Sequence, residues 1–408
     1  MILPQILYKI SKELTNYNAK AIIVGGAVRD YFLEQTIKDY DIEIYGLNHL
    51  EELEEILKKF GTVNLVGKSF GILKFNFNKE EFDFSFPRLE SKISKGHCGF
   101  DVVCDGALSF EEASKRRDFT INSMGYQIES KRFFDPFGGI DDIKKKSLRV
   151  VDSRTFIEDP LRVYRAIQFC ARFEFMLSTD TKLICVDMIN NNLLDELPKE
   201  RVFCELEKLM LKSNKPSIGF NLMRELGVLK YFEELERLNL DDWQEMMASI
   251  DSVAIKKETL DIMFASLLYK LNISDATSFL YKLTNNHKFI KSVVNLSYHY
   301  NIPKEFCMNK ARDRDIRELA TKVNISKLIK LVDDKRVEEW LLNSAKRLGV
   351  ESRPLEAILS GKDLIALGLK PSPKFKEILA YVYKLQLNGE IKTKEEACRV
   401  VRDNEKCK

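Results

Sequence analysis

The pattern of hydrophobic and polar positions changes character at about residue 150. Before it, short apolar runs rich in Ile, Val and Phe lie at Ala21–Val24, Ile42–Tyr45, Gly71–Phe77 and Glu81–Phe86. Helical patterns lie between them, at Gln5–Tyr17, Ala27–Leu33 and Leu50–Phe60. Short apolar runs bounded by turn residues are typical of strands, and the last two are predicted to pair as a hairpin. Residues 1–150 are therefore predicted to form an α/β head with a small mixed sheet.

After this point the apolar positions repeat every 3.6 residues, which indicates helices. Asp159-Pro160 is predicted to start one of them, with a carboxylate at the N-cap and a proline at the first helical position. Other amphipathic helices are predicted at Lys199–Lys212, Thr259–Leu271 and Arg336–Leu348. Few strand patterns remain, so an elongated all-α region is predicted to follow the head. Residues 88–115, which contain several glycines, are predicted to form a mobile loop.

Composition narrows the possible classes of protein. The hydrophobic fraction of 45% is too high for a disordered chain, and the 65 Lys+Arg against 62 Asp+Glu leave a net charge of only +3. Any nucleic-acid surface must therefore be local, with acidic and basic residues segregated. No apolar run approaches the ~20 residues of a membrane span, no signal peptide is recognisable, and the eight cysteines contain no Cys-x-x-Cys pair. These features predict a reduced, cytoplasmic protein without a disulfide framework or zinc site.

The first candidate site is a Gly-Gly turn. A buried strand pattern ends at Val24, Gly25 and Gly26 follow, and Arg29 lies one turn into the next predicted helix. Glycines allow a backbone to approach a phosphate closely, and an arginine nearby can pair with phosphate oxygens. Taken alone, the pattern more often marks a simple tight turn.

The second candidate is a pair of carboxylates, Asp39 and Asp41, that runs into an apolar strand pattern. Alternate residues of a strand share one face, and two carboxylates about 7 Å apart can hold two divalent cations. Such a pair more commonly marks a solvated strand end, but the phosphate-binding turn just upstream favours the metal interpretation. Asp83 lies alone in another apolar strand pattern, where a third metal ligand and an outward-facing polar position are both possible.

These motifs carry a family resemblance. Gly25-Gly26-x-Val28-Arg29-Asp30 with Asp39-x-Asp41 resembles the head of class II nucleotidyltransferases, which include CCA-adding tRNA nucleotidyltransferases and bacterial poly(A) polymerases. Three further blocks occur in family order: Arg116-Arg117-Asp118-Phe119-Thr120-Ile121-Asn122-Ser123-Met124, Glu158-Asp159-Pro160-Leu161-Arg162-x-x-Arg165-Ala166 and Leu197-Pro198-x-Glu200-Arg201-x-x-x-Glu205. The resemblance covers the first ~210 residues strongly and the tail, at Ser360–Leu364 and Gly368–Pro373, more weakly.

The resemblance implies a fold, an activity and a set of site residues. The implied fold is a polymerase-β-like head at residues 1–150, a helical neck at 151–222, a helical body at 223–305 and a tRNA-binding helical tail at 306–408. The implied reaction adds CCA to the tRNA 3′ end from CTP and ATP, with Mg²⁺ as cofactor and without a membrane or protein partner. The residues implied for metal binding and catalysis are Asp39 and Asp41, and those implied for nucleotide binding are Gly26, Arg29, Arg117, Asp159, Arg162 and Arg165.

One predicted helix offers a mechanism for choosing the base. Positions 159, 162, 165, 168 and 172 share a helical face and read Asp, Arg, Arg, Gln and Arg, which usually means a solvated charged face. An Asp acceptor beside an Arg donor, however, matches the Watson–Crick edges of cytosine and adenine and mispairs with uracil and guanine. The resemblance implies this use of Asp159 and Arg162, with Arg165 near the same nucleotide. Gln168 departs from the arginine common in the family, which leaves its role open.

Alternatives within and outside the class remain. A poly(A) polymerase has a similar template region, and an enzyme that adds only CC or only A is a further possibility. The predicted loop at residues 88–115 lies where the family carries a loop associated with the change from C to A addition, and its full length argues against C-only addition. A non-catalytic RNA-binding protein is disfavoured by the intact Asp39 and Asp41.

Overall fold

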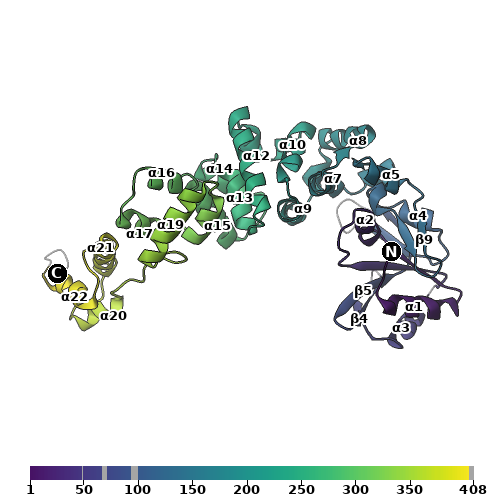
Figure 1. Cartoon of the computed structure of the whole chain (residues 1–408), viewed down its shortest axis with the longest axis horizontal. Coiled ribbons are helices and arrows are strands. Elements are labelled where there is room, and N and C mark those ends of the chain that lie inside the picture. Colours follow the sequence, from purple (N-terminus) through teal and green to yellow (C-terminus); the bar gives the residue numbers. More distant parts are fainter. Residues whose placement is uncertain (48, 67–70, 93–99, 404–408) are drawn as a thin grey trace. The chain divides into compact units, whose positions relative to one another are not determined.

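The computed structural model describes residues 1–47, 49–66, 71–92 and 100–403 (Figure 1). Contacts divide the chain into two compact units, Met1–Tyr231 and Phe232–Lys408. The predicted head and neck fall in the first unit, and so do residues 223–231 of the predicted body. The rest of the predicted body and the predicted tail fall in the second unit. The finer boundaries between head and neck and between body and tail stay predictions.

A seven-stranded mixed sheet forms the head and confirms the predicted fold class. Its strand order is β3-β4-β5-β2-β1-β8-β9. The strands are β1 (Lys20–Val24), β2 (Tyr40–Tyr45), β3 (Thr62–Val66), β4 (Ile72–Phe77), β5 (Glu80–Ser85), β8 (Gly125–Gln127) and β9 (Arg132–Phe134). All neighbours are antiparallel except β2 and β5, and β4 with β5 is the predicted hairpin. Helices α1 (Gln5–Thr15), α2 (Gly26–Phe32) and α3 (Leu50–Lys58) match the three predicted helices within two residues.

The register of the central strands brings the two candidate sites together. Val24, the last residue of β1, lies opposite Asp41 of β2, and Asp41 lies beside Asp83 of β5. Since Gly25 follows Val24 directly, the Gly-Gly turn and the acidic residues meet at one end of the sheet. Buried aliphatic and phenylalanine side chains fix this register, among them Ile23, Ile42, Phe82 and Phe84.

The predicted loop at residues 88–115 is wrong for most of its length. Strands β6 (Arg88–Lys92) and β7 (Phe100–Cys104) form a separate antiparallel pair, and α4 (Phe110–Ser114) follows with a capping box on Ser109. The pairing joins segments on either side of the glycines, and those glycines dominated the sequence pattern. Gly96 and Gly99 lie outside the described residues.

Helices complete the first unit. They are α5 (Gly139–Lys144), α6 (Ser153–Ile157), α7 (Leu161–Phe173), α8 (Thr179–Asn190), α9 (Lys199–Lys212) and α10 (Pro216–Leu226), with one short strand pair, β10 (Ser147–Leu148) and β11 (Met176–Leu177). α9 has the predicted bounds, whereas α7 begins two residues after Asp159, whose carboxylate accepts the Leu161 N–H at 3.3 Å. Gly219 allows α10 to approach α7 and α9 closely, because a Cβ there would collide with Leu209 and lie 3.2 Å from Ala171.

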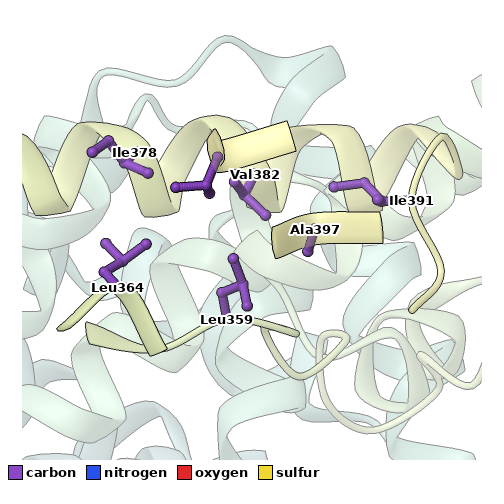
Figure 2. Packing of buried hydrophobic residues seen from close by; sticks show 7 residues of the cluster. Leu359, Leu364, Ile378, Val382, Ile391 and Ala397 are labelled. Carbon is purple, nitrogen blue, oxygen red and sulfur yellow. The ribbon is translucent and has the colours of Figure 1, made fainter. Parts of the chain in front are cut away.

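The second unit contains only helices in its described residues, as predicted. They are α11 (Glu233–Glu236), α12 (Leu240–Ile255), α13 (Leu260–Leu268), α14 (Ile273–Tyr281), α15 (His287–Tyr298), α16 (Ile302–Met308), α17 (Asp313–Lys322), α18 (Ile325–Leu328), α19 (Lys335–Leu348), α20 (Gly361–Ala366), α21 (Lys374–Asn388) and α22 (Lys394–Asp403). The last three helices share a small core of their own, which includes Leu364, Ile378, Val382 and Ala397 (Figure 2). Across the described ranges, no helix has the length and apolar character needed to cross a membrane.

Candidate active site

A polar pocket of about 770 Å³ lies within the first unit and collects most of the predicted site residues. Its lining residues are Gly25, Gly26, Arg29, Asp41, Arg88, Arg116, Arg117, Asp118, Asn122, Asp159, Leu161, Arg162, Arg165, Phe169, Glu200, Arg201, Cys204, Glu205 and Lys208. Eight basic residues face five acidic ones, and this excess of positive charge suits an anionic ligand such as a nucleoside triphosphate. Every residue predicted to bind nucleotide lines this pocket, as does Asp41, whereas Asp39 does not.

The turn at the pocket depends on Gly25 more than on the predicted Gly26. Gly25 has φ +67° and ψ −126°, a conformation that side chains disfavour, and a Cβ there would lie 2.8 Å from Nη1 of Arg117. A Cβ on Gly26 would meet Nη2 of Arg29 at 3.4 Å, an ordinary contact. Gly25 therefore allows the close approach of Arg117, and the predicted role of Gly26 at a phosphate stays a prediction.

Gly25→Ala is expected to destabilise the fold by about 1–3 kcal/mol through backbone strain and to raise the KM for nucleotide by displacing Arg117. Thermal unfolding and steady-state kinetics would measure the two effects. Gly227→Ala is the matched control, because Gly227 also has a positive φ, +84°, but a Cβ added there would have no atom within 4 Å. An unchanged nucleotide KM in Gly25→Ala would contradict the proposed contact with Arg117.

Buried Glu43 accepts hydrogen bonds from the two arginines that follow α4, Arg116 and Arg117. Glu43, only 2% exposed, accepts hydrogen bonds from Arg117 Nη2 at 2.9 Å, Arg116 Nη2 at 3.4 Å and the Tyr45 hydroxyl at 2.8 Å. Glu43 lies two residues after Asp41, on the same face of β2. Asp41 of β2 therefore lines the pocket, and Glu43 of the same strand positions Arg116 and Arg117 beside it.

Arg29 is a structural part of the pocket floor as well as a candidate ligand. It is 6% exposed, and it donates to Oδ1 of Asn122 at 2.7 Å and to Oδ1 of Asp30 at 2.6 Å. Its guanidinium also lies over the rings of Phe169 and Phe173, at 5.4 and 4.9 Å from the centroids. These contacts occupy part of its donor capacity and fix its position.

Asp118 links the head to α7. One carboxylate oxygen accepts from Asn122 at 2.9 Å and from the Phe119 N–H at 2.8 Å, and the other accepts from Arg165 Nε and Nη2 at 2.8 and 2.5 Å. Burial alone would raise the pKa of Asp118, but the charge of Arg165 and the hydrogen bonds from Asn122 and Arg165 lower it overall. Asp118 therefore stays ionised and holds Arg165 in the pocket wall.

The predicted base-reading residues all reach the pocket, but they are not paired with each other. Asp159 lies 3.5 Å from Arg201 Nη2, and Arg162 donates at 2.8 Å to the carbonyls of Thr155 and Arg116. Gln168, from the same sequence stripe, is 2% exposed and does not line the pocket. The structure thus separates Gln168 from the pocket-lining part of this face.

The acidic residues at the sheet end have the chemistry of a divalent-cation site. Asp41 is exposed to the pocket, yet the surrounding protein removes part of its hydration and so raises its pKa. The charge of Arg117 lowers this pKa, whereas the negative charges of Asp83, Asp39 and Glu43 raise it further. The pKa of Asp83 is also raised, first by burial, and its Oδ1 lacks a hydrogen bond although Lys74 lies 3.7 Å away. Within the described ranges no group of three or more potential ligands is preassembled. Crowded carboxylate oxygens nevertheless fit a hard divalent cation, which would offset their mutual repulsion.

Several lining residues had no role in the sequence interpretation. They are Arg116, Asp118, Asn122, Arg201 and Glu205. Glu205 is 3% exposed and accepts from Lys208 at 2.7 Å, while its other carboxylate oxygen is buried without a hydrogen bond. All five lie in blocks that resemble the family, so the signal was present without a chemical assignment.

Three family models together match most of this chain. Residues 21–149 match the poly A polymerase head domain, 174–238 match the RNA- and SrmB-binding region of polymerase A, and 255–400 match tRNA nucleotidyltransferase domain 2. The multifunctional CCA protein of Shewanella denitrificans is 32% identical over 320 residues, which are 75% of this chain and 73% of that protein. The corresponding protein of Acinetobacter baumannii is 29% identical over 81% of this chain and 85% of its own length.

Solved structures show the same fold. A CCA-adding enzyme in complex with ATP aligns with a TM-score of 0.72 at 21% identity, over 98% of this chain and 96% of that one. The Bacillus stearothermophilus CCA-adding enzyme in complex with CTP aligns with a TM-score of 0.71 at 23% identity, over 97% and 96%. Head, pocket and relatives together define a nucleotidyltransferase with a poly(A) polymerase-type head. Within that class, the chain belongs to the family of CCA-adding tRNA nucleotidyltransferases. Enzymes of this family generally use a divalent metal ion.

Proposed function

We propose that this protein adds the sequence CCA to the 3′ end of tRNA, with CTP and ATP as substrates and pyrophosphate as the leaving group. The observation that carries the proposal is the convergence of Asp41, the Gly25 turn and the α7 residues Arg162 and Arg165 on one pocket. In the reaction the RNA 3′-hydroxyl attacks the α-phosphate, and the bond from that phosphorus to the bridging oxygen of the pyrophosphate breaks. We place this chemistry in the cytoplasm, where tRNA and nucleoside triphosphates occur together.

The chain's own residues bind and orient the reactants. Asp39 and Asp41 would hold Mg²⁺, which when bound favours deprotonation of the attacking hydroxyl and offsets charge on the pyrophosphate. Arg117, fixed by Glu43, and Arg29, fixed by Asn122, present positive charge to the triphosphate. These arginines stabilise the negative charge that spreads over phosphate oxygens in the transition state.

Base selection is assigned to Asp159 as acceptor and Arg162 as donor. The two carbonyl contacts of Arg162 fix the plane of its guanidinium and leave other N–H groups for a base edge. Arg162→Ala is expected to reduce the preference for CTP over UTP by at least about tenfold, with a smaller change in triphosphate affinity. The preference falls because uracil no longer meets a mismatched donor at this position. The ratio of kcat/KM values for CTP and UTP measures this. Arg154→Ala, which removes an exposed arginine from neighbouring α6, should leave the ratio unchanged.

An incorporation assay distinguishes the possible activities. Given tRNA that lacks its 3′ CCA, together with CTP, ATP and Mg²⁺, the protein should add C, C and A and then stop. Long A tracts on unrelated RNA would identify a poly(A) polymerase instead. Arrest after CC, or extension only of tRNA that already ends in CC, would identify a specialised enzyme. Mature tRNA ending in CCA is the negative control.

A further inference from the structure

A cluster of basic side chains lies outside the pocket, beside Asp39. Helices α7 and α9 run side by side in the same direction. Asp159 and Arg201 are an ion pair near their starts, and Ala171 and Leu209 both adjoin Gly219 near their ends. This alignment brings together the basic residue in the last turn of each helix. These residues are Arg172 of α7 and Lys212 of α9.

Arg172 is held next to the pocket floor. Its guanidinium carbon lies 4.8 Å from the centroid of the Phe173 ring, and the guanidinium of Arg29 lies 4.9 Å from the same centroid. Asp30 is the acidic group whose charge reaches Arg172, but Asp30 is already bonded to Arg29. In the described part of the chain, neither Arg172 nor Lys212 has a carboxylate within ion-pair distance. The cluster therefore carries positive charge that the protein does not neutralise.

The mutual effect of these charges distinguishes the cluster from ordinary helix capping. Cations at a helix C-terminus are stabilised by the helix dipole, which would raise their pKa. Here the pKa of Lys212 is lowered by burial and by the charges of Arg172 and Lys208, and the pKa of Arg172 is lowered by burial and by Arg29. Lys38 adds to the repulsion on Lys212, and Asp39 only partly offsets it. A bound anion would relieve this repulsion.

The in-line geometry of the reaction indicates which anion binds to this basic cluster. In phosphoryl transfer the attacking and leaving oxygens lie roughly in line on opposite sides of the phosphorus. Asp41 lines the nucleotide pocket, whereas Asp39, two residues earlier on the chain, does not, and the charge of Asp39 reaches Lys212. With the triphosphate on the Asp41 side, the acceptor strand must approach from the Asp39 side.

We propose that Arg172 and Lys212 bind backbone phosphates of the single-stranded 3′ end of the acceptor RNA and so present its terminal hydroxyl at Asp39. This inference rests on the proposed function and names a positioning surface for one of its two substrates. Phosphate contacts of this kind fix register without reading sequence, as an acceptor end that changes with each addition requires.

Lys212→Gln and Arg172→Gln test the proposal. Each is expected to raise the KM for RNA by roughly 5- to 10-fold while the KM for CTP and kcat at saturating RNA change little, because only the acceptor contact is lost. The slope of log K against log salt for binding of a fluorescent tRNA without CCA should fall by about 0.7 per cation removed. Lys182→Gln is the control, since it removes an exposed lysine of α8 that is paired with Glu225. Thermal unfolding confirms that each variant is folded.

The possible outcomes separate this proposal from the function on which it rests. A raised KM for CTP with an unchanged KM for RNA would reassign the cluster to the triphosphate. Unchanged RNA binding and salt slope in both variants would leave only a helix-capping role, and the proposal would be wrong. Failure of the wild-type protein to extend tRNA would overturn the proposed function. The binding of the fluorescent tRNA would still test the proposal for Arg172 and Lys212, because binding does not depend on catalysis.

Discussion

Asp41→Asn is expected to lower nucleotide incorporation by on the order of 10³-fold or more while leaving the fold at least as stable as the wild type. The loss follows from the position of Asp41, the predicted metal ligand that lines the pocket next to the Gly25 turn. An asparagine keeps the shape but removes the charge that a divalent cation needs. Several kcal/mol of transition-state stabilisation correspond to a rate loss of this size.

The stability half of this prediction follows from the raised pKa of Asp41. A carboxyl group whose pKa is higher in the folded than in the unfolded state disfavours folding at neutral pH, where it is ionised. The neutral amide of the variant would remove that cost. The stability advantage of Asp41→Asn should therefore be complete above the raised pKa and should disappear as the pH falls towards the ordinary value of 3.8.

Single-turnover incorporation and unfolding curves at several pH values measure both effects. Glu81→Gln is a suitable control, because Glu81 is an exposed acid on β5 that pairs with Lys74 and lies outside the pocket. Substantial activity in Asp41→Asn would refute the proposal that Asp41 holds the Mg²⁺ used in catalysis. A large loss of stability at neutral pH would mean that the activity loss reports misfolding instead.

Local patterns were sufficient to predict much of the fold. The strand pair β4 and β5, the helix α9 and the Gly-Gly turn each depend on residues adjacent in sequence, where apolar periodicity and turn chemistry act directly. The same local argument gave the shared face of Asp159, Arg162 and Arg165. The argument failed for Gln168, which is buried outside the pocket. Helical spacing alone does not show which residues of one face reach a pocket and which are buried against other residues.

The supports of the site could not be predicted in this way. Arg162 is fixed by the carbonyl of Arg116, 46 positions earlier, and Arg117 is fixed by Glu43, 74 positions earlier. Such partners are chosen by the tertiary fold and leave no periodic signal. The one available hint was an acid, Glu43, between two isoleucines of a strand, since a buried acid needs a partner. The strands β6 and β7 were missed for a related reason, because their pairing joins segments separated by glycines.

Asp118→Asn is expected to destabilise the first unit by roughly 1.5–3 kcal/mol, the usual contribution of hydrogen bonds to a charged group, and to reduce kcat/KM by up to about 10²-fold. An amide at this position leaves Arg165 without its charged acceptor and weakens its hold in the pocket wall. The pKa of Asp118 is lower in the folded state, so its contribution is complete above the ordinary value of 3.8 and is lost as the pH falls through the lowered pKa. The difference in unfolding free energy between wild type and variant should shrink accordingly in acid.

A double-mutant cycle identifies Arg165 as the partner responsible for this loss. Arg165→Met removes the same ion pair from the other side, so the double variant should lose clearly less stability than the two single losses added together. Asp141→Asn serves as the control, because Asp141 is 69% exposed and pairs with exposed Lys144, and its effect should stay within about 0.5 kcal/mol. Additive losses would show that Asp118 acts through Asn122 and the Phe119 backbone alone. In that case the link between the head and α7 would not depend on the charge of Arg165, and its place in the pocket wall would need another support.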